Sequence, residues 1–530
     1  MQNKKLQVWL PLLFAIVMIV GMYFGSKLHN EMSGRNGLFK TGKRNSLQEA
    51  LDLIRLKYVD SVRMDTLQAN AIQDIMNELD PHSVYIPASK LQEVNEDLGG
   101  KFEGIGVEFN IFSDTVNVLY VIPSGPGDKA GLQIGDKILK ADSSSLVGGK
   151  VTTDEVKKII RGEQGSKTIL QIMRNHNISD FTVTRGMIPV SSVDASYMID
   201  KKTGYIKLNK FSEHTYVDFM QSLEALQKQG MQEMILDLRG NGGGFMNEAV
   251  DIADEFLDDS KLIVYTQGIN APKQEYKAKR PGLFETGKLT VLVDELTASA
   301  SEVLAGALQD WDRATIIGRR TFGKGLVQQQ YPLSDGSAIR LTTARYYTPL
   351  GRSIQRPYDK GKKVYMDEIW QRYSDGEALY ADSNKINNGK QYKTPKGRIV
   401  YGGGGIMPDI FVPLDTSTFQ RSSAKVILDG TLYKFVYLYY LQHKSQLQEF
   451  ATPEEFVKDF NNVNEMWHQL VQYSLKDTIN LNTVPETDKL SLEKRLKANL
   501  ARFRWRSEGY YEVLNTDDPV IKKAIEVLEK

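Results

Sequence analysis

Residues 289–311 read LTVLVDELTASASEVLAGALQDW. A β-like run at 289–295 leads through a short polar turn into an apolar helical pattern, so this stretch predicts a strand followed by a helix. The same alternation surrounds it, with strands predicted at 204–208, 233–238 and 314–318 and helices at 215–230 and 247–257. Strands that alternate with helices are typical of a largely parallel sheet covered by helices. The stretch therefore predicts an α/β core, which we place at 189–415.

The regions outside this core have different patterns. Apolar residues at helical spacing fill 45–100, where Asp80 and Pro81 end the second helical run. Region 101–188 carries short β-like runs, glycine-rich turns and one helix at 152–161. Helical, aromatic-rich segments fill 416–530, which we interpret as a packing or dimerisation appendage, so a homo-oligomer stays open. The 530 residues thus predict a multidomain α/β protein with helical N- and C-terminal appendages.

An uncharged stretch lies near the N-terminus. Residues 6–26 read LQVWLPLLFAIVMIVGMYFGS, and 21 residues of this character are long enough to cross a bilayer. A small-x-small cleavage site is not evident, so we interpret the stretch as an uncleaved transmembrane anchor. Basic residues on both sides of the stretch leave its orientation in the membrane open.

Composition excludes several classes of function. The 67 Lys and Arg residues are balanced by 66 Asp and Glu residues. The net charge therefore does not favour a nucleic-acid partner. The chain has no cysteine, which excludes a disulfide framework, a thiolate nucleophile and a Cys-ligated zinc site.

Ser299 is a candidate nucleophile because it lies where the predicted turn enters a helix. Unpaired amides at a helix start, together with the helix dipole, favour negative charge that develops there. Read alone, however, Ser299 and Glu302 also match a capping box, which would make the serine an ordinary N-cap. The stretch by itself leaves both interpretations open.

Lys324 is the candidate general base, in the segment TFGKGLVQQQ at 321–330. Gln328 lies four residues later, on the same face of a strand, where its amide oxygen can hold the lysine amine. A lysine base must be neutral near pH 7, so burial must lower its pKa by about three from ~10.4. The alternative is a solvated loop lysine. Of the six histidines only His214 falls among the relevant α/β segments, and His82 lies outside them, so a histidine-based triad is not supported.

A glycine run, LRGNGGG at 238–244, follows another predicted strand. Its amides can point at an oxyanion, although a plain strand-to-helix turn or a phosphate loop is also compatible. A nucleotide site is the rival interpretation, because GRRTFGK at 318–324 nearly matches the P-loop pattern. Gly325 stands where a P-loop needs Ser or Thr, and the residues that follow predict strands, so we reject the P-loop.

Together, TASASEVLAG (297–306), TFGKGLVQ (321–328) and LDLRGNGGG (236–244) resemble the C-terminal processing, or tail-specific, serine peptidase family. Lys324 follows Ser299 by 25 residues and Gln328 follows Lys324 by four, as in that family. The resemblance spans roughly 45–415 and departs at Thr297, where the family usually has a serine. It implies a serine endopeptidase without metal or cofactor. The implied site comprises Ser299 as nucleophile, Lys324 as general base, Gln328 as its partner, and the amides of Gly244 and Ala300 as the oxyanion hole.

The β-rich region resembles a PDZ domain, on the strength of GIGVEF (104–109) and VIPSGPGDKAGLQIGDKIL (121–139). In such a domain an extended protein tail adds to the sheet edge, so the implied partners are proteins or peptides with accessible C-termini. Arg161 falls where the family has an arginine proposed to couple PDZ position to activity, although an ordinary helix-end arginine is also compatible. The loop implied to bind the terminal carboxylate comprises Gly104, Ile105, Gly106 and Val107.

The resemblance also implies a location, since the Ser–Lys domain of this family lies outside the cytoplasm. We therefore expect a single-pass protein of the inner cell membrane, with residues after about 27 in the periplasm. The alternative function is a PDZ adaptor that binds tails on a peptidase-like scaffold without cutting them. The intact set of Ser299, Lys324 and Gln328 argues against the adaptor.

Overall fold

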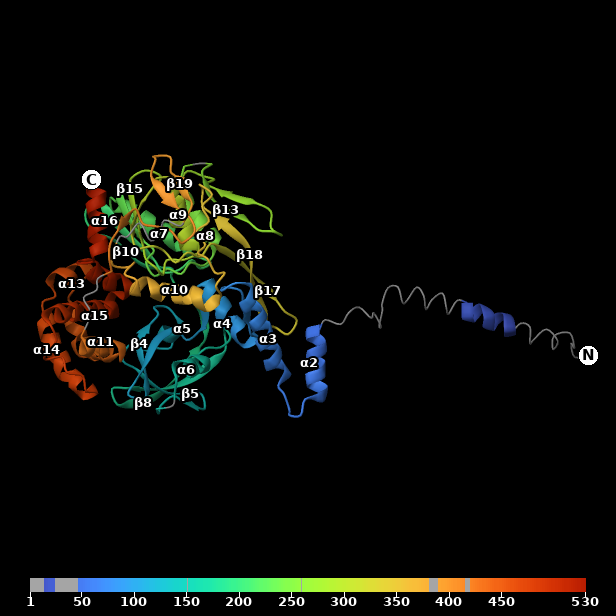
Figure 1. Ribbon diagram of the computed structural model, residues 1–530. Coiled ribbons are helices and arrows are strands. Elements are labelled where there is room, and N and C mark those ends of the chain that lie inside the picture. The colour runs from blue at the N-terminus through green and yellow to red at the C-terminus, as the bar shows by residue number, and fades with distance from the viewer. Residues whose placement is uncertain (1–13, 24–45, 150, 259, 381–388, 415–419) are drawn as a thin grey trace, which may run out of the picture. The chain divides into compact units, whose positions relative to one another are not determined.

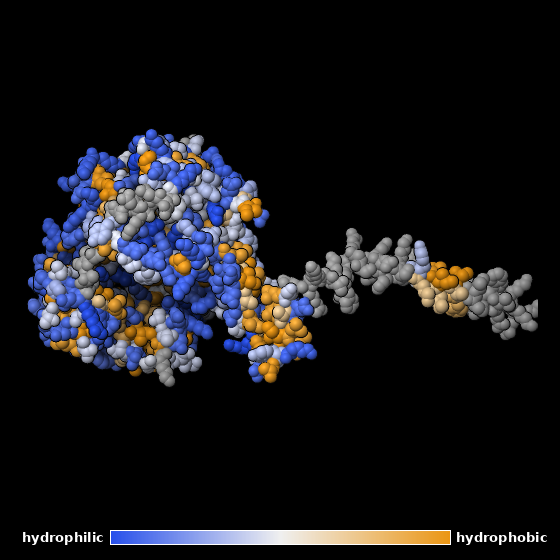
Figure 2. Space-filling view, in the orientation of Figure 1, coloured by the Kyte–Doolittle hydropathy of each residue, from blue (hydrophilic) through white to orange (hydrophobic). Residues whose placement is uncertain are grey.

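The computed structural model describes residues 14–23, 46–149, 151–258, 260–380, 389–414 and 420–530. The chain forms two compact units, Met1–Asp74 and Ile75–Lys530. The first unit contains a helix at 14–23, whose apolar side chains are exposed (Figure 2), α2 (Ser46–Lys57) and the start of α3 (Met64–Leu79). Within the described ranges, we find no helix with the length and apolar character that crossing a membrane requires, and the rest of the predicted anchor at 6–26 lies outside those ranges.

The second unit contains a six-stranded sheet, and Figure 1 shows its strands β10 and β15 near α7, α8, α9 and α16. Neighbouring strands run parallel except for the first two, which confirms the predicted α/β core with a largely parallel sheet. In spatial order the strands are β10 (Val193–Met198), β11 (Thr203–Leu208), β12 (Glu233–Asp237), β15 (Lys288–Val293), β16 (Thr315–Gly318) and β21 (Ile410–Phe411).

The central strands β11 and β12 are buried along their whole length because both faces of the sheet are covered. On one face, Leu236 packs into a cluster with the helices α7 (Thr215–Lys228), α8 (Met246–Asp254) and α9 (Ala300–Asp310). On the other face, the neighbouring Ile235 packs against α16 (Pro519–Glu529), which lies beside β15 (Figure 1). A helix from far outside the predicted 189–415 region thus covers the core sheet.

A second sheet carries the residues near Lys324. The hairpin of β17 (Leu326–Pro332) and β18 (Ala338–Tyr347) is its centre, and β18 also pairs with β1 (Val84–Ile86) and with β13 (Leu262–Gln267). The region predicted as helical at 45–100 therefore contributes a strand, β1, between α3 and α4. Strand β14 (Gln274–Lys277) pairs with β13 and completes this sheet, whereas β19 (Gln391–Lys393) and β20 (Ile399–Tyr401) form a two-stranded sheet of their own. The helices α4 (Ala88–Gly99) and α10 (Lys362–Ser374) belong to the same part of the chain.

The β-rich region forms an antiparallel sheet of its own, in the order β3-β4-β5-β7-β8, with β6 on β5. Strand β3 lies at the edge, and the predicted helix is present as α6, which begins with a capping box. Strand β2 pairs with β9 and brings the two ends of the region together. The elements are β2 (Lys101–Gly104), β3 (Val107–Phe112), β4 (Thr115–Val121), α5 (Pro126–Lys129), β5 (Lys137–Ala141), β6 (Ser144–Ser145), α6 (Thr153–Ile160), β7 (Lys167–Arg174), β8 (Asn177–Thr184) and β9 (Gly186–Pro189).

The C-terminal region is helical, as predicted, and packs on the β-rich region. Its apolar cluster includes Leu119 of β4, and Arg502 and Arg506 donate to the Glu108 carboxylate of β3 at 3.0 and 2.6 Å. Its longest helix is kinked at Trp505 and Arg506. The elements are α11 (Arg421–Leu428), α12 (Thr431–Leu447), α13 (Pro453–Asp459), α14 (Val463–Ser474), η1 (Leu475–Asp477), α15 (Glu486–Asn515) and α16.

Candidate active site

Ser299 occupies the N-cap position of α9 with φ 57° and ψ −116°. Few residues other than glycine adopt a positive φ, and such strained backbone is concentrated at functional sites. The preceding loop is tied to the glycine run, because the Thr297 hydroxyl donates to Leu238 O at 2.9 Å. A threonine at position 297 therefore supplies the hydroxyl that holds the Ser299 loop in place.

Glu302 joins the Ser299 loop to the Lys324 loop. Its buried carboxylate accepts hydrogen bonds from the amides of Ser299 (2.9 Å), Gly323 (2.7 Å) and Lys324 (2.8 Å), and from the Thr321 hydroxyl. Burial raises the pKa of Glu302, and these hydrogen bonds oppose the rise. Glu302, the capping-box glutamate of α9, thus also anchors the Lys324 loop. The same carboxylate serves both the helix cap and the candidate site.

Tyr346 bridges the same two loops from their carbonyl side. Its buried hydroxyl donates to Ser299 O at 3.1 Å and to Lys324 O. Glu302 and Tyr346 together hold both main-chain groups of Ser299 and Lys324, which fixes the two residues relative to each other. No motif at the sequence level pointed to Tyr346.

Lys324 and Gln328 meet as predicted, but they do not share a strand, because Lys324 lies in the loop before β17. The Lys324 amine donates to Gln328 Oε1 at 3.0 Å. Burial lowers the pKa of Lys324 and Arg340 lowers it further, whereas Glu302 and Asp80 oppose the shift. Among the described residues, Gln328 is the amine's one hydrogen-bond partner, and no hydrogen bond joins it to Ser299. The residues after Lys324 form strand β17, which confirms the rejection of a P-loop.

The other end of the Gln328 amide meets a residue that sequence reasoning set aside. Gln328 Nε2 donates to the main-chain carbonyl of His82 at 2.6 Å. The His82 ring lies 2.9 Å from the Tyr365 hydroxyl, and burial together with the Lys324 charge lowers the pKa of His82 to about 3. The available signal was the sequence Asp-Pro-His-Ser at 80–83, which resembles a side-chain-stabilised turn and was interpreted only as a helix end.

The glycine run approaches Ser299 closely. A Cβ on Gly243, whose φ is 94°, would lie 2.8 Å from Ser299 Cβ and 2.9 Å from Ala300 N, so a side chain does not fit. A Cβ on Gly244 would lie 2.0 Å from Phe211 O. Within the part of the chain that the structure describes, the amides of Gly244 and Ala300 have no hydrogen-bond acceptor. Two unused amides beside a serine are what an oxyanion hole requires.

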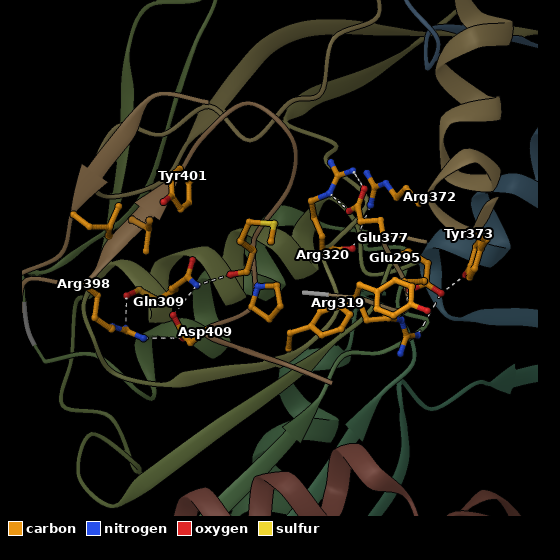
Figure 3. Close-up of a pocket in the computed structure, with 17 residues that line it drawn as sticks. Glu295, Gln309, Arg319, Arg320, Arg372, Tyr373, Glu377, Arg398, Tyr401 and Asp409 are labelled. Carbon is orange, nitrogen blue, oxygen red and sulfur yellow. Dashed lines mark hydrogen bonds and ion pairs between the residues drawn. The ribbon is translucent and has the colours of Figure 1, made fainter. Parts of the chain in front are cut away.

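A cavity of about 520 Å³ lies next to the Lys324 loop, where β15, β16 and β21 end (Figure 3). None of the predicted catalytic residues lines it. Figure 3 shows Arg320 pointing at Glu377, to which it donates two hydrogen bonds. Arg372 of α10 donates to the carbonyls of Thr321 (2.8 Å) and Phe322 (3.2 Å), directly before Lys324. Each arginine that lines the cavity is paired with a carboxylate, so the cavity does not present an open anion site.

The predicted carboxylate-binding loop joins β2 to the edge strand β3. Gly104 ends β2, Gly106 has φ 71°, and Val107 begins β3. Arg161 lies over the Phe102 ring (4.8 Å to its centroid) and pairs with Glu96 of α4 at 3.2 Å. Arg161 therefore connects the neighbourhood of this loop to α4, instead of only ending α6.

Comparison with known proteins adds to this geometry. Residues 202–361 match the model for peptidase family S41, residues 103–184 match the model for the PDZ domain, and residues 424–506 match a family of unknown function. A carboxy-terminal-processing protease of Bartonella bacilliformis is 35% identical over 313 residues, 58% of this chain and 71% of that protein.

Two further proteins are similar. The carboxy-terminal processing protease CtpA of Bacillus subtilis is 34% identical over 317 residues, 59% of this chain and 67% of that protein. The solved structure of a photosystem II D1 C-terminal processing protease is 28% identical, with a TM-score of 0.37, and covers 70% of this chain and 86% of that one. The family models and the extent of the match to the Bartonella protein show that the chain belongs to peptidase family S41, as a PDZ-containing carboxy-terminal processing protease.

Proposed function

We propose that Ser299 and Lys324 perform the serine-protease chemistry of this chain, on protein substrates whose C-termini the PDZ domain binds. The observation that carries the proposal is the double connection between the two residues, in which Glu302 accepts from both amides and Tyr346 donates to both carbonyls. A nucleophile and its base must be held in one geometry, and these contacts supply it.

In the proposed reaction, the neutral Lys324 amine takes the proton of the Ser299 hydroxyl while Oγ attacks the peptide carbonyl carbon. The amides of Gly244 and Ala300 donate to the oxyanion of the tetrahedral intermediate. Lys324 then gives its proton to the departing amine, which leaves an acyl group on Ser299. A water molecule then gives a proton to Lys324 and attacks the acyl carbon. The bond from this carbon to Ser299 Oγ breaks, Lys324 returns the proton to Oγ, and the product leaves with its new carboxyl terminus. Substrate binding has to bring Lys324 within hydrogen-bond distance of Ser299, as is common for catalytic groups.

Two features support the preference for C-termini. Strand β3 is an edge strand of the PDZ sheet among the described residues, so an extended tail can add to it. The loop of Gly104, Ile105, Gly106 and Val107 precedes this edge, where its amides would hold the terminal carboxylate. Arg161 would relay occupancy of this loop through Glu96 and α4 to the peptidase core.

A membrane location belongs to the same proposal. The uncharged stretch at 6–26 would serve as a single anchor, with the protease domain on the periplasmic side of the inner membrane. Alkaline carbonate extraction of membranes, with and without residues 6–26, tests this part. Release of the full chain by carbonate would contradict it.

Cleavage of fluorescein-labelled casein tests the catalytic assignment. We expect Ser299→Ala and Lys324→Arg to be inactive, the latter because a guanidinium does not give up its proton. Ser222→Ala is the matched control, since within the described ranges its hydroxyl bonds only the Asp218 carbonyl of α7. Full activity of Ser299→Ala would refute the assignment. Mass spectrometry after treatment with an acylating inhibitor should find the adduct on Ser299, and its absence would favour the PDZ adaptor.

A further inference from the structure

The turn at 80–83 is built from side chains that bond its own main chain. Asp80 Oδ1 accepts from the amides of His82 (2.8 Å) and Ser83 (2.9 Å), and Asp80 Oδ2 accepts from the Ser83 hydroxyl at 2.5 Å. Asp80 and Ser83 are buried, with 8% and 1% of their surface exposed. These bonds fix the direction of the peptide group between His82 and Ser83, and hence of the His82 carbonyl.

The turn is also attached to the strands that carry Gln328. The amide of Thr342 donates to the Ser83 hydroxyl at 3.2 Å, and Thr342 is the cross-strand partner of Gln328. Strand β1 starts at Val84, directly after the turn, and pairs with β18 from Arg340 onward. The position of the turn relative to Gln328 is therefore set by main-chain pairing as well as by side-chain bonds.

The His82 carbonyl determines which end of the Gln328 amide faces Lys324. A carbonyl oxygen only accepts hydrogen bonds, so at 2.6 Å it selects the Nε2 end of the amide. Oε1 is then left to accept from the Lys324 amine at 3.0 Å. If the amide turned over, two acceptors would face each other at His82 and two donors would face the lysine.

We propose that Asp80 and Ser83 are positioning residues for the reaction: they hold the His82 carbonyl so that Gln328 presents its oxygen to Lys324. The inference rests on the proposed Ser299 and Lys324 mechanism. Although burial raises the pKa of Asp80, hydrogen bonds from Ser83 and from the amides of His82 and Ser83 keep it below its usual value. The carboxylate that organises the turn is therefore ionised over the neutral range.

A double-mutant cycle on labelled casein tests the inference. Asp80→Ala should lower kcat about tenfold at unchanged KM, because the amine that takes the Ser299 proton loses its fixed acceptor. Gln328→Ala should lower kcat as well, and the double variant should be no slower than Gln328→Ala alone. If Asp80→Ala lowers kcat by the same factor with and without Gln328, the turn acts by another route and the inference is overturned.

Control variants separate a catalytic effect from damage to the fold. Asp335 makes the same kind of turn with Ser337, at the tip of the β17 and β18 hairpin, so Asp335→Ala should leave kcat unchanged. Asp80→Asn keeps an oxygen that accepts from both amides and should restore most of the rate. If Asp80→Ala does not fold, as judged by its thermal unfolding midpoint, Ser83→Ala replaces it in the cycle.

The outcomes also distinguish this inference from the proposed function. If Ser299→Ala still cleaves casein, the mechanism itself fails. If Ser299→Ala is inactive while Asp80→Ala, or the folded Ser83→Ala, keeps full kcat, only the role of the turn fails.

Discussion

Tyr346→Phe removes one hydroxyl that serves two partly buried carbonyls. Ser299 O keeps the amides of Glu302 (2.9 Å) and Val303 (3.0 Å) as donors, so its loss is small. Lys324 O has no other donor among the described residues, so the substitution leaves this partly buried carbonyl without a partner. An unsatisfied buried acceptor costs about 1–3 kcal/mol. If the substitution displaces Lys324 and this free energy is lost from stabilisation of the transition state, kcat/KM falls about 5- to 150-fold.

The assay is steady-state cleavage of labelled casein, with thermal unfolding recorded for each variant. Tyr392→Phe is the matched control, because its hydroxyl also donates to a main-chain carbonyl, that of Gly351, away from Ser299. We expect the control to cleave casein at the wild-type rate. A Tyr346→Phe protein with kcat/KM within about twofold of wild type would show that the bridge between the two loops is dispensable, and the reasoning would be refuted.

Three further outcomes are expected. Arg340→Gln removes a positive charge that lowers the pKa of Lys324, so the pKa should rise and the acid limb of the kcat/KM profile should move to higher pH. In the folded protein His82 stays neutral down to about pH 3, whereas in the unfolded chain it gains a proton near pH 6.5. The free energy of unfolding should therefore fall as the pH drops from about 6.5 to about 3. In His82→Gln, denaturation midpoints measured over this range should depend less on pH. Glu108→Lys should break its pairs with Arg502 and Arg506, and hydrogen exchange should then increase in β3 and at the kink of α15.

Sequence reasoning succeeded where one local pattern decided the structure. Strand and helix periodicity predicted the parallel core. The contact between Lys324 and Gln328 was also predicted, although only Gln328 lies on a strand and Lys324 lies in the loop before it. Residues 297–306 predicted that a helix starts at Ser299. Ser299 is the N-cap of α9, whose first residue is Ala300. Each of these inferences needed only neighbouring residues.

It failed where distant segments meet through main-chain groups. The contact between His82 and Gln328 uses a carbonyl that any residue possesses, so no residue type marked it. Tyr346 reaches two carbonyls from the far end of β18, and the pairing of β1 with β18 depends on tertiary folding. The helical pattern of α16 predicted a helix but did not reveal which sheet it covers.

The placement of α16 has a consequence for how the protein is made. Every strand of the core sheet precedes residues 519–529 in the chain, so the ribosome releases the whole sheet before the helix that covers its second face. In the finished fold, Leu292 of β15, the strand that leads to the Ser299 loop, packs in one apolar cluster with residues of α16. Asp518, at the start of α16, also supplies the carboxylate that meets Arg239 beside the glycine run, at 2.8 Å. A protease built in this order acquires this support of its reactive loops only after every strand of its core sheet has been synthesised.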